Sequence, residues 1–457
     1  MLFSKKDEKK DIRKDIMIAQ GVRGNAQINN NTLVIGNKKS GKYKSFIVPN
    51  LKAILGSYII TDNNNIMYDK TNEFFQKNGY EIIKIDLNKE SDYNPFLYMN
   101  ENIDIEEFSQ SIAKGINVTD DIFYEDICEI MLEYIVQYTK LKDIEKQNLY
   151  FVTKVVEKLK EKDVNYFFAL MSKSNINVER LEKISNKVYV LALDMLKEKL
   201  DAIGMQNIKN INSTSEIDFS KILTKRTIVY VNLNESAVIN GIFFKDIIKK
   251  LYNFADRNIL SNITTTYFIL DNFDKLGNIS MFDKKIITSK SRKIVYCLIT
   301  DNIKPLLDIY KSSFSTIISA CDLDLYLGTD NFETIKYISE NLGGSISEKT
   351  LQELHPSICI VYEKELAPIK AVKLGEIAPS EDELKLHKEH IFQKKEEIKQ
   401  QEREARKEKR KRLIDELEEK IRLEKDPKKK AKLEQSRDLM KNLKKFRIAR
   451  RNFIWEV

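Results

Sequence analysis

Short apolar runs alternate with amphipathic stretches along most of the chain. Each run is bounded by Gly, Asn or Asp, and helical patterns separate one run from the next. This alternation is typical of buried strands in a parallel sheet, so it predicts an α/β fold. The runs lie at residues 32–36, 57–61, 80–86, 226–233, 265–271, 293–300, 323–328 and 358–372.

A long helical stretch divides these strands into two groups. From about residue 103 to residue 201 apolar residues recur at spacings of three and four, and no proline interrupts them. We interpret this stretch as an all-α insertion. The chain then has five expected parts: a charged N-terminal segment (1–29), the first part of the α/β domain (30–100), the all-α insertion (101–215), the second part of the α/β domain (216–380) and a charged helical tail (381–457).

The tail carries the formal net charge of the chain. Residues 381–457 hold 26 basic and 18 acidic residues, so they account for the whole excess of +8. Pro427 is the only helix breaker, which predicts one long charged helix or two, with a weak heptad pattern suited at most to a coiled coil. Six basic residues gather near its end: Lys441, Lys444, Lys445, Arg447, Arg450 and Arg451.

Three roles fit this tail. It is a solvated spacer or oligomer contact, or its basic end binds nucleic acid with Phe446, Phe453 or Trp455 stacked on bases. The third role is attachment to an anionic membrane surface through the same basic and aromatic residues. The sequence leaves these three open.

Several classes of protein are disfavoured. No run of about 18 apolar residues encodes a membrane-spanning helix, and the charged N-terminus lacks the apolar core of a signal peptide. Four cysteines lie far apart, and three histidines lie outside the apparent core, so no metal site is expected. The expected location is the cytoplasm, or the inner face of the cell membrane as a peripheral protein.

One motif fits a phosphate-binding loop. Gly36 and Gly41-Lys42 have the G-x-x-x-x-G-K spacing, directly after an apolar run. Glycines let backbone N–H groups face a phosphate, the following helix start adds partial positive charge, and Lys42 reaches the outer phosphates. A glycine turn with surface lysines is the alternative. The expected nucleotide-contacting residues are Gly36, Ser40, Gly41, Lys42 and Tyr43, and the expected ligand is ATP.

The magnesium part of this motif departs from the usual pattern. Tyr43 stands where a Ser or Thr hydroxyl normally holds Mg²⁺, and its hydroxyl lies at the far end of a rigid ring. Ser45 is a poor substitute, since two residues along a helix rotate a side chain by about 200°. Asp271 ends an apolar run and suits a magnesium shell, but Asn272 has no basic oxygen to activate water. An ordinary Asp-Asn turn after a core strand is the alternative.

Several segments in order resemble the type IV secretion coupling proteins, the DNA-transfer P-loop ATPases related to TraG and TraD. The resemblance runs from about residue 30 to residue 377. Its segments are NTLVIGNKKSGKYKSFIVPNL, SYIITD, YNPF, LDNFDKLGNI, TSKSRKIVYCLIT and CDLDLYLGTDNFETIKYISENLG.

The resemblance implies a RecA-like motor, usually a hexamer, that recognises a relaxase–DNA complex and feeds DNA or protein into a secretion channel. By position it assigns nucleotide contacts to Gly36, Gly41 and Lys42 and the second acid to Asp271. Arg292 lies in the family's Ser-Arg segment. Other secretion components and a homo- or hetero-oligomer are the implied partners.

The sequence departs from the family at the catalytic positions. Tyr43 replaces the magnesium-binding hydroxyl, and Asn272 replaces the glutamate base. Asn63 to Asn65 stand where Pro-Lys-Gly is usual, Thr300 stands where Gln is usual, and no N-terminal membrane helices are apparent. We therefore expect a pseudo-ATPase that keeps the fold and an assembly role, with weak or no Mg²⁺ binding. An active DNA translocase with an unusual site and a scaffold without nucleotide remain as alternatives.

Overall fold

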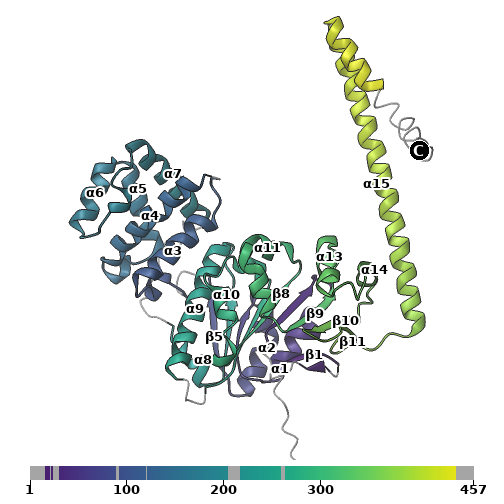
Figure 1. Cartoon of the computed structure of the whole chain (residues 1–457), viewed down its shortest axis with the longest axis horizontal. Helices are drawn as coiled ribbons and strands as arrows, with labels where there is room; N and C mark the ends of the chain where they lie inside the picture. The colour runs from purple at the N-terminus through teal and green to yellow at the C-terminus, as the bar shows by residue number, and fades with distance from the viewer. Residues whose placement is uncertain are drawn as a thin grey trace, which may run out of the picture. The chain divides into compact units, whose positions relative to one another are not determined.

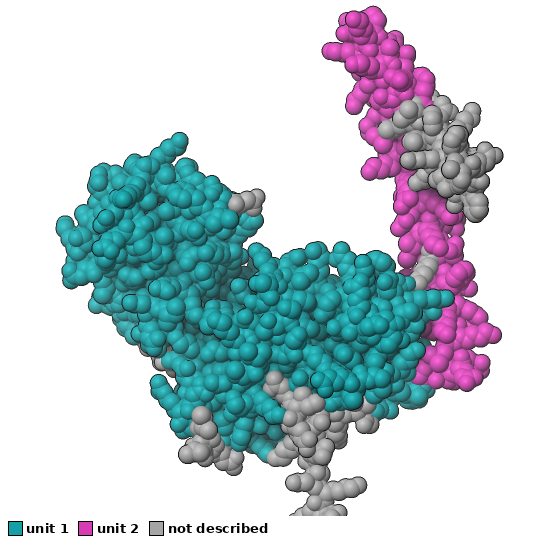
Figure 2. Space-filling view, in the orientation of Figure 1, with its two compact units in different colours: residues 1–378 teal, residues 379–457 magenta. Residues whose placement is uncertain are grey.

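The computed structural model describes residues 16–20, 22–23, 30–88, 92–119, 121–203, 217–258 and 263–438. The described chain divides into two compact units, residues 1–378 and residues 379–457 (Figure 2). The first unit holds the sheet, its covering helices and the helical insertion (Figure 1).

A nine-stranded sheet forms the centre of the first unit, in the order β11-β10-β9-β3-β8-β7-β4-β6-β5. Seven strands from β9 to β5 are parallel, whereas β10 and β11 add an antiparallel edge. The strands are β3 (Thr32–Gly36), β4 (Ser57–Thr61), β5 (Glu81–Asp86), β6 (Thr227–Asn232), β7 (Thr266–Asp271), β8 (Ile294–Thr300), β9 (Leu323–Gly328), β10 (Ile358–Glu363) and β11 (Ile369–Val372).

Both faces of the sheet are covered, which explains the continuous apolar runs. On β3, Leu33 and Ile35 belong to one hydrophobic cluster, and Val34 belongs to the cluster on the opposite face. Successive strand residues point to opposite faces, so a strand buried on both sides needs apolar residues throughout. The predicted α/β fold, with its insertion and long C-terminal helix, is confirmed.

Helices cover the sheet and form the insertion between β5 and β6. The covering helices are α1 (Val48–Lys52), α2 (Ile66–Lys77), α8 (Ser220–Thr224), α9 (Ala237–Arg257), α10 (Phe282–Ile286), α11 (Lys304–Tyr310), α12 (Phe314–Ser319), α13 (Phe332–Asn341) and α14 (Glu348–Gln352). The insertion contains α3 (Asn102–Gly115), α4 (Ile122–Lys140), α5 (Leu149–Lys160), α6 (Val164–Lys173) and α7 (Asn186–Ala202).

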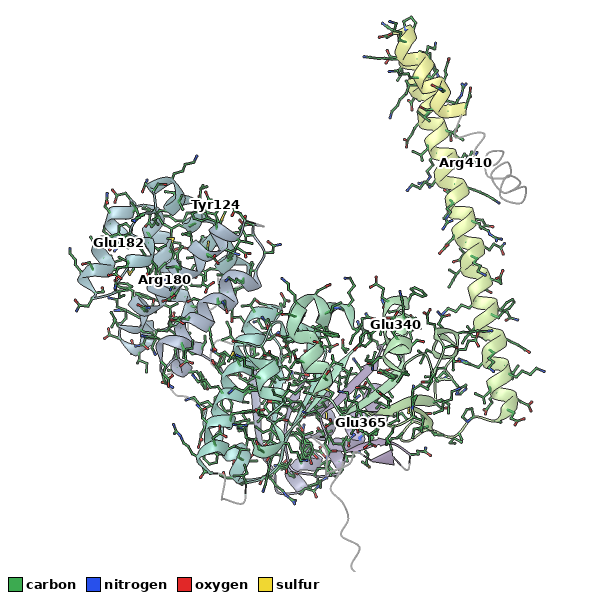
Figure 3. The ribbon with its side chains drawn as sticks, in the orientation of Figure 1. Tyr124, Arg180, Glu182, Glu340, Glu365 and Arg410 are labelled. Atoms are coloured by element: carbon green, nitrogen blue, oxygen red, sulfur yellow. The ribbon has the colours of Figure 1, made fainter. Side chains whose placement is uncertain are left out.

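The insertion has its own apolar core and a polar surface. Met131, Phe167 and Leu193 are fully buried between its helices. Arg180 on its surface (Figure 3) forms an ion pair of 2.6 Å with Glu133 of α4. The helices therefore pack as a small bundle, and no strand occurs among the described residues of this stretch.

The YNPF segment is the joint between the sheet and the insertion. The Tyr93 hydroxyl donates to the buried Asp246 carboxylate on α9. The Asn94 side chain accepts from the Phe96 amide and donates to the Gln147 carbonyl of the insertion. This motif therefore has a structural role, since its polar groups fix where the chain leaves the sheet.

The N-terminal segment contains structure that its charged sequence did not suggest. β1 (Met17–Ala19) pairs with β2 (Val22–Arg23), and Ile18 is buried. The Met17 backbone N–H donates to the Asn50 side chain, and that side chain donates back to the Met17 carbonyl. A two-way amide contact holds this short strand, whose apolar residues 16–19 form a run too short to stand out in the charged segment.

The second unit is a long helix followed by a shorter helical segment. α15 (Glu381–Leu423) begins at a capping box formed by Ser380 and Glu383. The helix is interrupted at residues 424–426, and a new helical segment begins at Pro427. Proline is tolerated at the first position of a helix, because the N–H that it lacks has no partner there. The six basic residues predicted to bind nucleic acid or membrane lie outside the described residues.

Candidate nucleotide site

The phosphate loop connects β3 to a π-helical turn at Tyr43–Ile47. Gly36 has no room for a side chain, because a Cβ there would lie 2.9 Å from Leu327 Cβ. Gly41 has φ of +80°, a conformation that other residues rarely adopt. The two glycines of the motif are therefore required by the backbone path. A glycine turn on its own would not explain the buried lysine that follows.

Two buried serine hydroxyls beside the loop have no hydrogen-bond partner in the structure. They are Ser40 Oγ and Ser45 Oγ. Ser40 Oγ lies 2.5 Å from the position that a Cβ on Gly36 would take, and Ser45 Oγ lies 3.5 Å from the equivalent position on Gly41. Buried polar atoms usually have partners, so unpartnered donors at a loop of this shape fit an anionic ligand.

Lys42 is buried between two carboxylates at the ends of neighbouring strands. Its side chain is 2 % exposed, and its Nζ lies 2.8 Å from Asp271 Oδ1 and 2.7 Å from Asp301 Oδ1. Burial lowers the pKa of Lys42, but the charges and hydrogen bonds of Asp271 and Asp301 outweigh that effect and raise its pKa overall. Lys42 therefore stays charged at neutral pH.

The Tyr43 hydroxyl donates to the other oxygen of the same acid. The distance from Tyr43 OH to Asp271 Oδ2 is 2.6 Å. Burial and the Asp271 charge raise the pKa of Tyr43, so the phenol stays protonated and can donate. The length of the ring brings the hydroxyl to this acid. Both carboxylate oxygens of Asp271 are thereby engaged within the chain.

The residues after Asp271 form a tight turn. Asn272 has φ of 54° and ψ of 51°, a left-handed conformation that Asn tolerates better than most residues. Two positions further on, burial raises the pKa of the Asp274 carboxyl. Asp274 Oδ1 accepts a long hydrogen bond of 3.4 Å from Thr300 Oγ1. A carboxylate therefore lies near the site, although the expected glutamate position holds an amide.

Asn63 to Asn65 also form a turn that asparagine favours. Asn64 and Asn65 have φ of 60° and 59°. The preceding Asp62 carboxylate accepts from the backbone N–H groups of Met67 and Tyr68 at the start of α2. The asparagines therefore form the turn, and Asp62 accepts hydrogen bonds from the start of the helix that follows it.

Arg292 does not join the site within one subunit. Arg292 precedes β8 and so lies near the amino ends of the parallel strands. Lys42, Asp271 and Asp301 lie at the carboxyl ends of these strands, on the opposite side of the sheet's length. Its guanidinium binds the Asp256 carboxylate of α9 at 2.7 Å and 2.9 Å. A catalytic role for Arg292 stays a prediction, and it would require a neighbouring subunit.

Asp301 is the site residue that sequence reasoning missed. It directly follows β8, and β8 lies between β3 and β7 in the sheet. The carboxyl ends of adjacent parallel strands meet at one edge, so an acid after β8 must lie between the loop and Asp271. The signal was an apolar run ending in Thr-Asp, which becomes informative only when the strand order is known.

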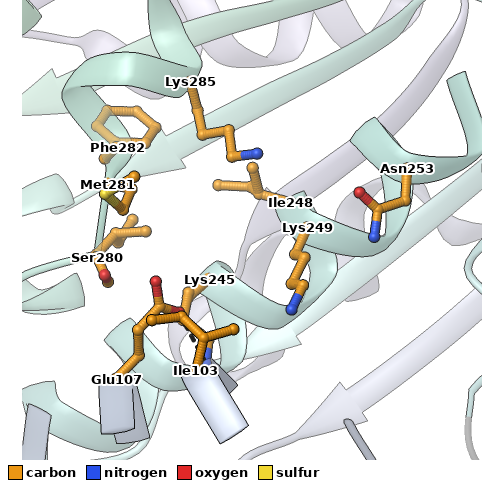
Figure 4. A pocket seen from close by; sticks show the side chains of 11 residues that line it. Ile103, Glu107, Lys245, Ile248, Lys249, Asn253, Ser280, Met281, Phe282 and Lys285 are labelled. Carbon is orange, nitrogen blue, oxygen red and sulfur yellow. Dashed lines mark ion pairs between the residues drawn. The ribbon is translucent and has the colours of Figure 1, made fainter. Parts of the chain in front are cut away.

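A separate pocket of about 140 Å³ lies where α3 meets α9 and α10 (Figure 4). Glu107 of α3 pairs with Lys245 of α9 at 3.6 Å, and Lys249 binds the Asp104 carboxylate. Lys285 of α10 also points into it (Figure 4). The pocket shares no residue with the phosphate loop, and its ion pairs tie the insertion to the sheet layer.

Comparison with known proteins identifies the family. Residues 3–355 match the family model described as type IV secretory system conjugative DNA transfer. The chain belongs to this family. No curated protein sequence matches the chain.

Solved structures share the fold. The bacterial conjugative coupling protein TrwBΔN70 in its trigonal form with sulphate has a TM-score of 0.63 at 12 % identity, over 81 % of this chain and 92 % of that chain. TrwB in complex with ADP and Mg²⁺ has a TM-score of 0.61 at 11 % identity, over 81 % and 92 %. VirB4 of Thermoanaerobacter pseudethanolicus has a TM-score of 0.52 at 14 % identity, over 79 % and 93 %.

These findings confirm the resemblance drawn from the sequence. The protein is a coupling-protein-like component of type IV conjugative DNA transfer with a P-loop NTPase fold. Within the described residues, no helix is long and apolar enough to cross a membrane, and no group of three or more His, Cys, Asp or Glu residues is arranged to hold a metal ion.

Proposed function

We propose that this coupling-protein-like component binds ATP at the phosphate loop and has lost efficient hydrolysis. The observation that carries the proposal is the double engagement of Asp271, by Lys42 on one oxygen and by Tyr43 on the other. Asn272 supports it, since an amide cannot accept a proton from water at neutral pH.

The residues fit the phosphates of a nucleotide. Gly36 and Gly41 allow the backbone to curve, and the Ser40 and Ser45 hydroxyls are free to donate. Lys42 needs only to rotate away from its two acids to contact a phosphate, because its charge is already held in the loop. ATP is therefore the proposed ligand. The coupling protein TrwB, which shares the fold, has been solved in complex with ADP and Mg²⁺.

The residues do not fit Mg²⁺ in the usual way. A magnesium shell at this position takes a Ser or Thr hydroxyl and a carboxylate oxygen. The Tyr43 hydroxyl donates to Asp271 Oδ2, and Asp271 Oδ1 pairs with Lys42 until that lysine turns to a phosphate, so the position of the usual Ser or Thr hydroxyl is held by a group that binds the acid instead. No step in the proposed function therefore depends on the metal.

The biological role that we propose is assembly in a DNA-transfer complex. Family membership supports a relaxase–DNA complex or other secretion components as partners, and a homo- or hetero-oligomer with an active relative as the working form. A cytoplasmic location, with peripheral contact to the inner face of the membrane through the tail, is the corresponding proposal for its place in the cell.

Calorimetry and phosphate release test this proposal together. ATP is titrated into the full chain with and without Mg²⁺, and phosphate release is followed with and without single-stranded DNA. Lys42→Ala is the control for both. We expect ATP binding that hardly depends on Mg²⁺ and no phosphate release. Turnover by the wild type that Lys42→Ala abolishes would show that the protein is a motor, and absence of ATP binding would show that it is a scaffold.

One observation favours an active enzyme as the second candidate. Burial raises the pKa of the Asp274 carboxyl, which lies two residues after Asn272 on the same turn. A carboxylate with a raised pKa is a better base, so Asp274 could take the role of the missing glutamate. If the wild type releases phosphate, Asp274→Asn should reduce the rate at least about 100-fold, whereas an unchanged rate would exclude this role.

A further inference from the structure

A second buried lysine contacts the phosphate loop from behind. Lys373 follows β11, is 2 % exposed, and donates from its Nζ to two backbone carbonyls. One carbonyl belongs to Ser40 in the loop, at 2.9 Å, and the other belongs to Leu327 at the end of β9, at 2.7 Å. No motif in the sequence marked this residue.

The Ser40 carbonyl sets the direction of the next amide. In a trans peptide the C=O and the following N–H point to opposite sides of the peptide plane. When Lys373 draws the Ser40 oxygen to the rear of the loop, the Gly41 N–H must face the front. Gly41, with φ of +80°, then continues the curve that leads to Lys42.

The second contact fixes the loop against the sheet. Leu327 lies on β9, where Gly36 of β3 pairs with Gly328 and the Asn37 N–H donates to the Gly328 carbonyl. Lys373 therefore links the end of β9, through the Leu327 carbonyl, to the phosphate loop, through the Ser40 carbonyl. An apolar side chain of the same length would pack there but would leave both carbonyls with a donor fewer.

The chain around Lys373 is held from the N-terminal side. The Gln20 N–H donates to the Val372 carbonyl, and the Gln20 side chain donates to the Lys373 carbonyl. Just beyond, Glu376 pairs with Lys44 on the turn after the loop, at 2.7 Å. Three segments that are far apart in sequence thus meet behind the phosphate loop.

We propose that Lys373 is a positioning residue for nucleotide binding, which orients the Ser40–Gly41 peptide so that the loop amides face the phosphates. The proposal rests on nucleotide binding at this loop as proposed above, but the orientation of the loop can be measured without any nucleotide. Lys373 acts only through the backbone and does not contact the phosphates itself.

The charge of Lys373 gives the proposal a pH dependence that packing alone would lack. Burial lowers the pKa of Lys373 to about 8. The groups that face it are Glu376 and Cys359, and burial raises the pKa of Cys359 to about 11. Lys42, with its raised pKa, does not lose its proton in this range. Between pH 7.5 and 9.5 the donor behind the loop is therefore the group that titrates.

The experiment compares Lys373→Met with Lys199→Met in the full chain. Lys199 is fully buried in the insertion and donates to the carbonyls of Ala113 and Ile116, so it matches Lys373 in burial and bonding but lies elsewhere. Hydrogen exchange of the amides in residues 37–45 is measured without nucleotide from pH 7.5 to 9.5 and is expressed as protection relative to the intrinsic exchange rate at each pH. ATP affinity is measured over the same pH range.

We expect Lys373→Met to speed loop exchange and weaken ATP binding by about tenfold each, and to remove the fall in affinity above pH 8. Lys199→Met should leave loop exchange unchanged. In the wild type, which needs no substitution, loop protection should fall as the pH rises through 8. Unchanged loop protection in the variant, or in the wild type across this pH range, would overturn the proposal. If the wild type binds no ATP, the proposed function fails, and loop exchange alone decides the role of Lys373.

Discussion

Asp301 should weaken ATP binding, because it holds Lys42 away from the phosphates. Lys42 Nζ lies 2.7 Å from Asp301 Oδ1, and the Asp301 side chain is 26 % exposed. A charged hydrogen bond of this kind, partly screened by water, contributes about 1 kcal/mol. ATP binding must break it, so the observed affinity is lower than that of a loop with a free lysine.

Asp301→Asn is therefore expected to tighten ATP binding about fivefold. Isothermal titration calorimetry without Mg²⁺ measures the change directly. Asp308→Asn is the matched control, since Asp308 pairs with Lys304 at 3.3 Å on the surface and lies outside the site. The control should bind ATP as the wild type does.

A double-mutant cycle separates two causes of this gain. Asp301→Asn also removes a negative charge near the phosphates, which favours ATP without involving Lys42. If release of Lys42 is the cause, the gain should shrink in a Lys42→Met background, whereas a purely electrostatic gain should persist there. Unchanged or weaker ATP binding by Asp301→Asn would refute the reasoning, because Lys42 would then not be restrained by this acid.

Three further predictions concern the same chain. Lys42→Met should lower the free energy of unfolding by about 3 kcal/mol in urea titrations without nucleotide, because it leaves the buried Asp271 carboxylate without its lysine partner, and adding Asp271→Asn should recover part of that loss. Burial raises the pKa of Asp324 from 3.8 to about 6, so its contribution to stability is complete below pH 4 and is lost as the pH rises through 6. Asp324→Asn should therefore be more stable than the wild type by about 2 kcal/mol at pH 8 but not at pH 4, as measured by urea unfolding at both values. Tyr43→Thr with Asn272→Glu should raise Mg²⁺-dependent phosphate release at least about 100-fold over the wild type in a phosphate-release assay, and no gain would show that other groups limit hydrolysis.

The strands were predictable because each is a local feature. A run such as residues 294–300, which is buried throughout, predicts a strand by itself. A strand that is buried on both faces needs apolar residues at nearly every position. The first strand, β1, was missed because its apolar run covers only residues 16–19 within a charged segment, and the Asn50 side chain that holds it lies far away in the sequence. The local hydrophobic pattern therefore predicts the strands of the large sheet but does not predict a strand as short as β1.

The site was predictable only where a motif spans it. Lys42 and Asp271 came from spacing and from strand ends, and the structure brings them to 2.8 Å. Asp301 and Lys373 are 259 and 333 residues from their partners in the loop, Lys42 and Ser40. Neither lies in a motif, so only the order of the strands and the path after β11 bring them to the site.

The departures at Tyr43 and Asn272 are linked through Asp271 and form one arrangement. Without nucleotide, Lys42 and Tyr43 each contact one oxygen of Asp271, and a glutamate at position 272 would add a second negative charge beside this arrangement. Asn272 is neutral, and it suits the left-handed turn at that position. Restoring the base alone should therefore destabilise the site, and restoring the hydroxyl alone should free Asp271 without a group to activate water. Activity therefore requires that the hydroxyl and the base are both restored. By the same reasoning, a chain that has lost one of these two groups gains no activity by keeping the other.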